Sequence, residues 1–213
     1  MKDLQLMFAQ SSIVFELQHY RFHSAKVEEL LTNEMIKLRE EHDEMTKDWP
    51  AFDRAEFFEN AHDDYWELGT KFPEIQRTSS VISVYSVLEN SLNRLCSLYA
   101  KLIQSNIEIS DFGEADIIKR ARIYLTKVAN IDFPLDHNSW TEIMMIQQIR
   151  NKLVHAQGII PSGNQKLIGY IKGNQFLELS EGYKIIINKG FVEYCTRVFD
   201  SFFEEFFKRN RKI

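Results

Sequence analysis

Glycine, proline and cysteine are scarce in this chain, and each scarcity narrows the range of structures. The 213 residues include 8 glycines, 4 prolines and 2 cysteines. So few turn-forming residues argue against an all-β sandwich and against collagen-like or linker-rich chains. Cys96 and Cys195 stand in apolar helical patterns without the spacing of metal ligands. We therefore expect buried, reduced thiols and a cytoplasmic protein.

Several sequence signatures of function are missing as well. There is no run of about 18 apolar residues and no apolar signal-peptide core, so we expect no transmembrane helix and no membrane partner. A glycine-rich phosphate loop, a nucleophile elbow and a zinc motif are all lacking. The triplets His42-Asp43-Glu44 and His62-Asp63-Asp64 are interpreted as solvated helix faces and not as metal sites, because adjacent helical residues diverge by about 100°. We expect neither a metal nor a cofactor.

The abundant residues favour a helical, globular chain. Apolar residues make up 44% of the sequence and charged residues 27%, with 26 Lys and Arg against 31 Asp and Glu and a net charge of −5. The length is sufficient to bury a core. The acidic balance counts against a non-specific nucleic-acid binder, although a local basic cleft is compatible with it.

Apolar residues recur at helical spacing along most of the chain. The first stretch is one long helix or two helices that break near His23, and the second is closed by Gly69. Ser139 is the expected N-cap of a later helix, with Glu142 as its capping-box partner. The last helix carries a phenylalanine-rich stripe, which we expect in the core. The predicted helices span 3–47, 51–68, 79–103, 114–129, 139–157 and 189–209.

The composition of the sequence changes in residues 165–188, where short segments rich in β-branched residues alternate with glycines. This pattern predicts a small β-hairpin or a three-stranded insertion. The expected fold class is all-α, in a single domain over 1–213. Its expected parts are an N-terminal helical extension at 1–70, a bundle core at 75–157 and 189–209, and the hairpin at 165–188.

One predicted helix, 139–157, combines a stripe of isoleucines with polar groups suited to chemistry. Asn151 and His155 are four residues apart and share a face. Arg150 lies about 140° around the helix axis from His155, and its long side chain can extend toward the face that Asn151 and His155 share. A histidine titrates near neutral pH, and the forked donors of an arginine match phosphate oxygens. In the plain structural alternative, Arg150 pairs with an acid and the helix dipole favours His155 at the C-terminus.

The run Arg150-Asn151, followed by His155, resembles the motif of the HEPN superfamily, in which four to six residues separate an arginine from a histidine. The resemblance covers roughly residues 75–157, with the phenylalanine-rich helix as a fourth bundle member. It implies a HEPN-like helical bundle with long N-terminal helices and a small hairpin insertion before the C-terminal helix. Gln157 replaces a tyrosine of some toxin members, so regulation by modification at that position is not expected.

The resemblance also implies an activity. The implied activity is that of a metal-independent endoribonuclease, which cleaves RNA through attack of the 2′-hydroxyl at a composite site in a homodimer. The implied setting is a toxin–antitoxin or phage-defence system. Arg150, Asn151 and His155 are then the catalytic residues. Glu89 is a candidate supporting residue, either as an ion-pair partner of Arg150 or, in the alternative, as a solvated glutamate. Expected partners are RNA, a second copy and an antitoxin or regulatory protein. The candidate RNA contacts are Lys119, Arg120, Arg122 and Lys152.

Two alternatives stay open. A non-catalytic HEPN-like module would use the same helix to dimerise or to bind a nucleotide or a protein. An unrelated helical scaffold would carry the Arg150–His155 match by accident, and removing the match would then change stability only.

Overall fold

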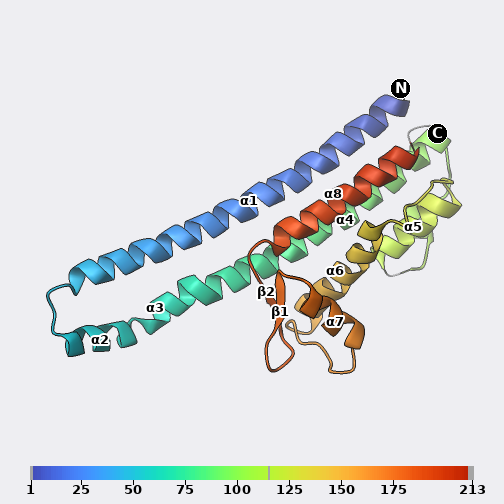
Figure 1. Ribbon diagram of the computed structural model, residues 1–213. Coiled ribbons are helices and arrows are strands. Elements are labelled where there is room, and N and C mark those ends of the chain that lie inside the picture. Colours follow the sequence, from blue (N-terminus) through green and yellow to red (C-terminus); the bar gives the residue numbers. More distant parts are fainter. Residues whose placement is uncertain (1, 115, 211–213) are drawn as a thin grey trace.

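A computed structural model describes residues 2–114 and 116–210, which form a helical bundle with a projecting arm (Figure 1). Helix α1 (Lys2–Met45) and helix α4 (Phe72–Ile103) run antiparallel, and α8 (Phe191–Asn210) packs against both. The expected all-α class is confirmed. The remaining elements of the bundle are a 3₁₀ turn at Ile109–Asp111, α5 (Ile117–Lys127), α6 (Asn138–His155), α7 (Gln165–Gly173), β1 (Leu177–Leu179) and β2 (Ile185–Ile187).

The core lies where α4, α6 and α8 meet. Helix α8 buries its phenylalanines because they recur on one face, as the sequence predicts. Leu88 and Leu92 of α4 and Ile146 of α6 are fully buried. Cys96 and Cys195 are buried and free, as expected. None of the helices in the described part of the chain is both long and apolar enough to span a membrane.

The first stretch is a single helix, α1, so the alternative of two helices is wrong. Its N-terminal half belongs to the bundle, because Leu6, Ile13 and Leu17 lie in the same core as α4 and α8. The expected extension at 1–70 is therefore divided. Only residues 29–76 project from the bundle, as an arm that is visible at the left of Figure 1.

The arm contains the second half of α1, then α2 (Ala51–Asn60), α3 (His62–Trp66), a π-helical turn (Glu67–Lys71) and the start of α4. The expected helix at 51–68 with a stop at Gly69 is wrong, because the chain continues through the π-helical turn into α4. A Cβ atom at Gly69 would lie 3.0 Å from Cε of Met35, so the glycine permits the close approach of α1. No residue of α2 is buried.

The hairpin predicted over 165–188 is wrong for its first third, which forms α7. Asn164 caps this helix by accepting a hydrogen bond from the backbone N–H of Leu167. Leu167, Ile168 and Ile171 are buried on one face, a spacing that suits a helix as well as a strand. The hairpin itself is real but short, with β1 antiparallel to β2 and Leu177 opposite Ile187.

The expected capping box at the start of α6 is also wrong. His137 is the N-cap, and its Nδ1 accepts a hydrogen bond from the backbone N–H of Ser139. Glu142 instead accepts hydrogen bonds from the hydroxyls of Tyr170, at 2.6 Å, and of Tyr194, so it joins α6 to α7 and α8. Burial is the main cause that raises the pKa of Tyr194 to about 12, and the hydrogen bond to Glu142 adds to it.

Candidate functional site

The C-terminal half of α6 carries the candidate site on the side that the bundle leaves open. Ile143, Ile146 and Ile149 are buried and anchor the helix on the core. The helix ends at His155, where the backbone N–H of Gly158 donates to the carbonyl oxygen of Lys152 at 2.9 Å. Gln157, between them, has a φ of 51°, a left-handed conformation of the kind that commonly ends a helix. This turn places the end of the helix, and with it His155, in a defined position.

Arg150 is held between α6 and α4. Its guanidinium lies 3.9 Å from a carboxylate oxygen of Glu89 and 5.4 Å from the ring centre of Tyr85. It also donates a hydrogen bond to the side-chain oxygen of Asn151 at 3.1 Å. The Arg150 Nε is buried without a hydrogen-bond partner among the described residues. The guanidinium is thus fixed on one side and keeps an unused donor.

The surroundings of Arg150 are acidic and partly dry. Burial raises the pKa of Glu89 above its ordinary value, the charge of Asp116 adds to the rise, and Arg150 opposes it. The same burial raises the pKa of Tyr85. Asp116 accepts hydrogen bonds from the side chain of Gln147 and from the backbone N–H of Lys119, so it connects α6 to the start of α5. Elements α4, α5 and α6 therefore meet beneath Arg150.

Asn151 and His155 lie on the solvent side of α6, and both are exposed. They are neighbours one turn apart on the same face. Within the residues that the structure describes, His155 has no hydrogen-bond or ion-pair partner. The structure therefore brings Arg150, Asn151 and Glu89 into contact and leaves the imidazole of His155 free to meet a ligand or a second chain.

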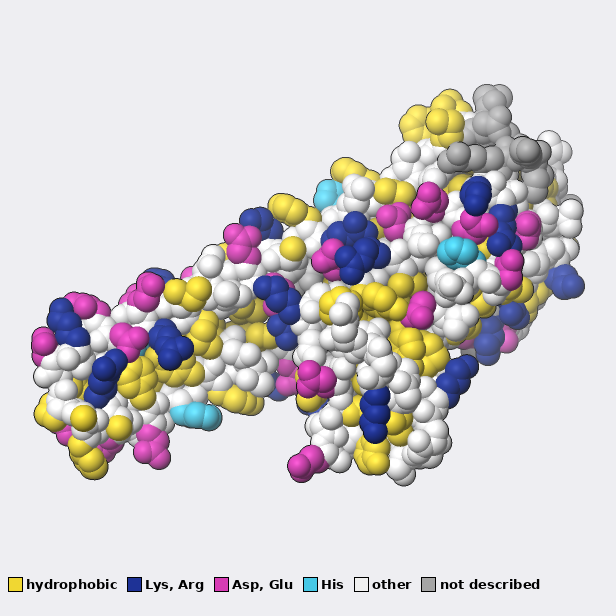
Figure 2. All heavy atoms as spheres, viewed as in Figure 1, with side chains coloured by type: hydrophobic (Ala, Val, Ile, Leu, Met, Phe, Trp, Pro, Cys, Tyr) yellow, Lys and Arg dark blue, Asp and Glu magenta, His cyan; other side chains and the backbone are white. Residues whose placement is uncertain are grey.

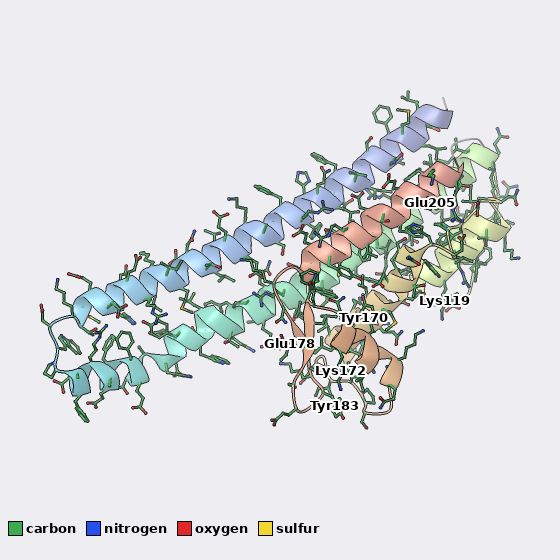
Figure 3. The ribbon with its side chains drawn as sticks, viewed as in Figure 1. Lys119, Tyr170, Lys172, Glu178, Tyr183 and Glu205 are labelled. Atoms are coloured by element: carbon green, nitrogen blue, oxygen red, sulfur yellow. The ribbon has the colours of Figure 1, made fainter. Side chains whose placement is uncertain are left out.

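The candidate RNA contacts are spread over two helices. Lys152 is on α6 beside the motif, whereas Lys119, Arg120 and Arg122 belong to α5, which packs against α4. Lys119 is exposed and points outward from α5 (Figure 3). Arg120 is half-buried, and its Nε has no hydrogen-bond partner among the described residues. Of the four candidate contacts, Lys152 is thus the one that shares a helix with His155.

Sequence reasoning did not find Tyr85, Asp116 and Gln147 as neighbours of the site. Tyr85 and Glu89 are four residues apart on α4, and this spacing places both side chains toward α6. A tyrosine within an apolar stripe is a usable signal, because its hydroxyl end prefers a polar partner or solvent. The contact of Asp116 with Gln147 had no local signal, since the two residues are brought together only by the packing of α5.

The described residues contain no group of three or more His, Cys, Asp or Glu side chains arranged to hold a metal ion. The two histidines that precede acidic pairs have different surroundings. Nδ1 of His42 lies 3.0 Å from the Tyr65 hydroxyl, whereas His62 is largely exposed. Two hollows of about 560 and 520 Å³ lie away from His155, one beside Cys96 at the end of α4 and one beside Trp49 on the arm.

The chain was compared with protein-family models, curated proteins and solved structures, and no match was found in any of the three comparisons.

Proposed function

We propose that this protein is a metal-independent endoribonuclease of the HEPN type. The observation that carries the proposal is the arrangement at the end of α6. Asn151 and His155 are exposed on one face, and Arg150 beside them is fixed by Glu89 and by the ring of Tyr85. A solvent-exposed histidine and an oriented arginine at the end of one helix supply two of the groups that attack of a 2′-hydroxyl on a phosphate uses, an acid or base and a cationic donor.

The proposed reaction needs three groups. A base removes the proton of the 2′-hydroxyl as its oxygen attacks phosphorus, and an acid protonates the 5′-oxygen as the phosphorus–oxygen bond breaks. His155 takes one of these roles. Arg150 donates hydrogen bonds to the phosphorane oxygens from the part of its guanidinium that is not buried, since its side chain keeps 22% exposure. Asn151 holds the guanidinium and orients it. The products are a 2′,3′-cyclic phosphate and a 5′-hydroxyl.

A second histidine is required because one imidazole cannot act on both sides of the phosphorus at once. We infer that it comes from a second copy, with the exposed ends of the two α6 helices facing each other across a two-fold axis. Val154 supports this arrangement, because it is an apolar side chain with 42% exposure between Asn151 and His155 in sequence. Burying it in a dimer would remove apolar surface from water.

The distribution of charge supports RNA as the substrate despite the net charge of −5. Residues 29–76, the arm, contain fourteen acidic and five basic residues. Residues 150–189, which include the end of α6, α7 and the hairpin, contain six basic and two acidic residues. A locally basic surface raises the concentration of an anionic substrate near it. The acidity of the chain thus belongs mainly to the arm.

The setting that we propose is a cytoplasmic toxin–antitoxin or phage-defence system, in which an antitoxin or another regulatory protein restrains the nuclease. The free, buried thiols of Cys96 and Cys195 fit a reducing compartment. Lys152 and the basic residues of α5, namely Lys119, Arg120 and Arg122, are proposed contacts to RNA outside the reaction centre.

A second candidate function is that of a non-catalytic interaction module, and the arm favours it. Phe52 and Trp66 of the arm are 77% and 45% exposed, in surroundings that are strongly acidic. Exposed aromatic side chains of this size are typical of protein-binding surfaces. In this candidate the arm binds a partner and the end of α6 only dimerises, so the protein would cut no RNA.

The deciding experiment is cleavage of RNA in EDTA by the wild type and by the variant His155→Ala. The matched control is His62→Ala, which removes an exposed histidine of α3 far from α6. We expect the first variant to lose activity by at least about 100-fold and the control to cut as the wild type does. Mass spectrometry of the products should find cyclic-phosphate ends. Equal cutting by all three proteins would exclude His155 as the catalytic group.

A further inference from the structure

A strained tyrosine stands at the tip of the hairpin. Tyr183 has a φ of 56°, in the left-handed region that disfavours bulky side chains. The other described non-glycine residues with positive φ are Gln104, Asn130 and Gln157, which are polar residues just beyond the ends of helices. Tyr183 is the aromatic exception, and the residue is 42% exposed.

The glycine of this loop, Gly182, lies one position before the strained residue. The backbone N–H of Tyr183 donates to the carbonyl oxygen of Ser180, and that of Ser180 to the carbonyl oxygen of Lys184, both at 3.0 Å. This is a tight turn followed by a left-handed residue, the position at which glycine is favoured. Gly182 precedes that position and does not adopt a positive φ. The loop thus keeps a tyrosine where a glycine would be more stable.

Such an outlier calls for a reason outside the loop itself. The side chain of Tyr183 has no hydrogen bond, ring contact or ion pair with any residue that the structure describes, so no polar or aromatic interaction there compensates for the backbone strain. A partly exposed ring without such partners is accessible to an external ligand. The strain is therefore explained most directly by a ligand that contacts the ring.

Backbone pairing holds this ring near the proposed reaction centre. The N–H of Ile160 donates to the carbonyl oxygen of Tyr183, and the N–H of Ile185 donates to that of Gly158, both at 3.0 Å. The hairpin is thus clamped to the segment that directly follows α6. Ile160 is five positions after His155, which limits the distance between their Cα atoms to about 18 Å.

The charge of the segment that contains the tip suits an anionic strand. Residues 150–189 contain six basic residues against two acidic ones, Glu178 and Glu181. Lys172 at the end of α7 and Tyr183 at the hairpin tip lie on the same lobe of the molecule, which Figure 2 shows with side chains of both charges (Figure 3). Lys184 follows Tyr183 directly and pairs with Glu74 at 2.5 Å, whereas Lys172 has no ion pair among the described residues.

We propose that Tyr183 is a stacking platform for an unpaired base of the RNA strand that is cut beside His155. The inference rests on the proposed function and adds the substrate class, which is single-stranded RNA. Aromatic side chains bind unpaired bases through their π-faces, whereas the bases of a duplex are stacked on each other and unavailable. The strained backbone presents the ring to the strand at a cost in stability.

The test measures binding of a fluorescently labelled, single-stranded 12-nucleotide RNA in the His155→Ala background, so that the probe stays intact. The variants are Tyr183→Gly, Tyr183→Phe and, as the matched exposed aromatic on the arm, Phe52→Ala. We expect Tyr183→Gly to weaken binding by about 10-fold, Tyr183→Phe to bind within about 2-fold of the parent, and Phe52→Ala to change nothing. Tyr183→Gly should also raise Tm by about 2–4 °C, because the strain is removed.

The outcomes separate the two proposals. If Tyr183→Gly binds RNA as tightly as its parent, or if it melts at a lower temperature, the platform is wrong. If the parent does not bind the RNA at all, the platform is equally wrong. If Tyr183→Gly weakens binding while wild type and His155→Ala cut RNA equally, the platform stands and the proposed nuclease fails. If His155→Ala abolishes cutting and Tyr183→Gly has no effect on RNA binding, the proposed nuclease stands and the platform fails.

Discussion

The ion pair between Glu28 and Arg77 offers a sharp test of how the arm is attached. Nε and Nη2 of Arg77 donate to the two carboxylate oxygens of Glu28 at 2.6 and 2.8 Å, and Nη1 donates to the carbonyl oxygen of Ile187 at 3.3 Å. Glu28 is only 7% exposed. One guanidinium therefore joins α1, α4 and β2 where residues 29–76 leave the bundle. The perturbation is Arg77→Met, which keeps the aliphatic length and removes the charge.

The expected cost follows from what the variant leaves behind. Removing one partner of a buried pair leaves the other charge without compensation, which costs about 3–5 kcal/mol. For a chain of this size the loss corresponds to a fall in Tm of about 6–20 °C. The double variant Glu28→Leu with Arg77→Met buries no unpaired charge, so most of the loss should be recovered. The control is Arg94→Met, because Arg94 also pairs α4 with α1, through Glu16 at 2.6 Å, but at an exposed position.

Urea unfolding of the wild type, both single variants and the double variant gives the full cycle, with the control measured in parallel. We expect the control to lose no more than about 1 kcal/mol, as exposed pairs do. A loss below about 1 kcal/mol for Arg77→Met would contradict the reasoning that burial sets the cost. So would a double variant as unstable as Arg77→Met alone, since the penalty would then lie in lost packing and not in the orphaned carboxylate.

Two further predictions concern the site and the glycines. Because burial raises the pKa of Glu89, the folded protein holds that proton to higher pH than the unfolded chain does, so the free energy of unfolding falls as pH rises from about 4 through the folded pKa. Glu89→Gln should flatten this fall in urea midpoints measured between pH 4 and pH 7, and an unchanged slope would contradict the assignment. Gly169→Ala should stabilise α7 by about 0.5–1 kcal/mol in thermal melts, because an added Cβ meets no atom within 4 Å. Gly190→Ala should destabilise the protein, because its φ is 96° and the Cβ would lie 2.8 Å from the Phe176 ring; equal Tm values for the two variants would refute the comparison.

The parts of the fold that sequence predicted well are those in which one face of a long helix is apolar. The pattern over 79–103 predicted α4, and the phenylalanines of α8 were placed correctly in the core. A long amphipathic stripe can be buried in only one way, so its period determines both the element and its inner face. The ion pair of Glu89 with Arg150 was one of two alternatives, and the choice between them depends on how α4 packs against α6 and not on a local pattern.

The predictions for short elements were wrong because their local sequence patterns are ambiguous. Tertiary contacts decide which structure such a segment adopts. In 165–173 three apolar residues suit one face of a helix as well as a buried strand, and the cap from Asn164 favours the helix. Glu142 has the right spacing for a capping box, yet two tyrosine hydroxyls from α7 and α8 bind its carboxylate. These partners lie 28 and 52 residues away in sequence, so no local pattern reveals them.

The net charge of the chain is a poor guide to its partners because the charges are partitioned in space. An acidic arm of residues 29–76 and a basic region at 150–189 are averaged into one value of −5. The screening length at physiological salt is about 8 Å, so an acidic arm that projects from the bundle contributes little to the field at the end of α6. The potential at the end of α6 is set by the nearby charged side chains. The argument from global charge against a nucleic-acid partner therefore applies to the arm and not to the surface around His155, where the proposed RNA substrate would bind.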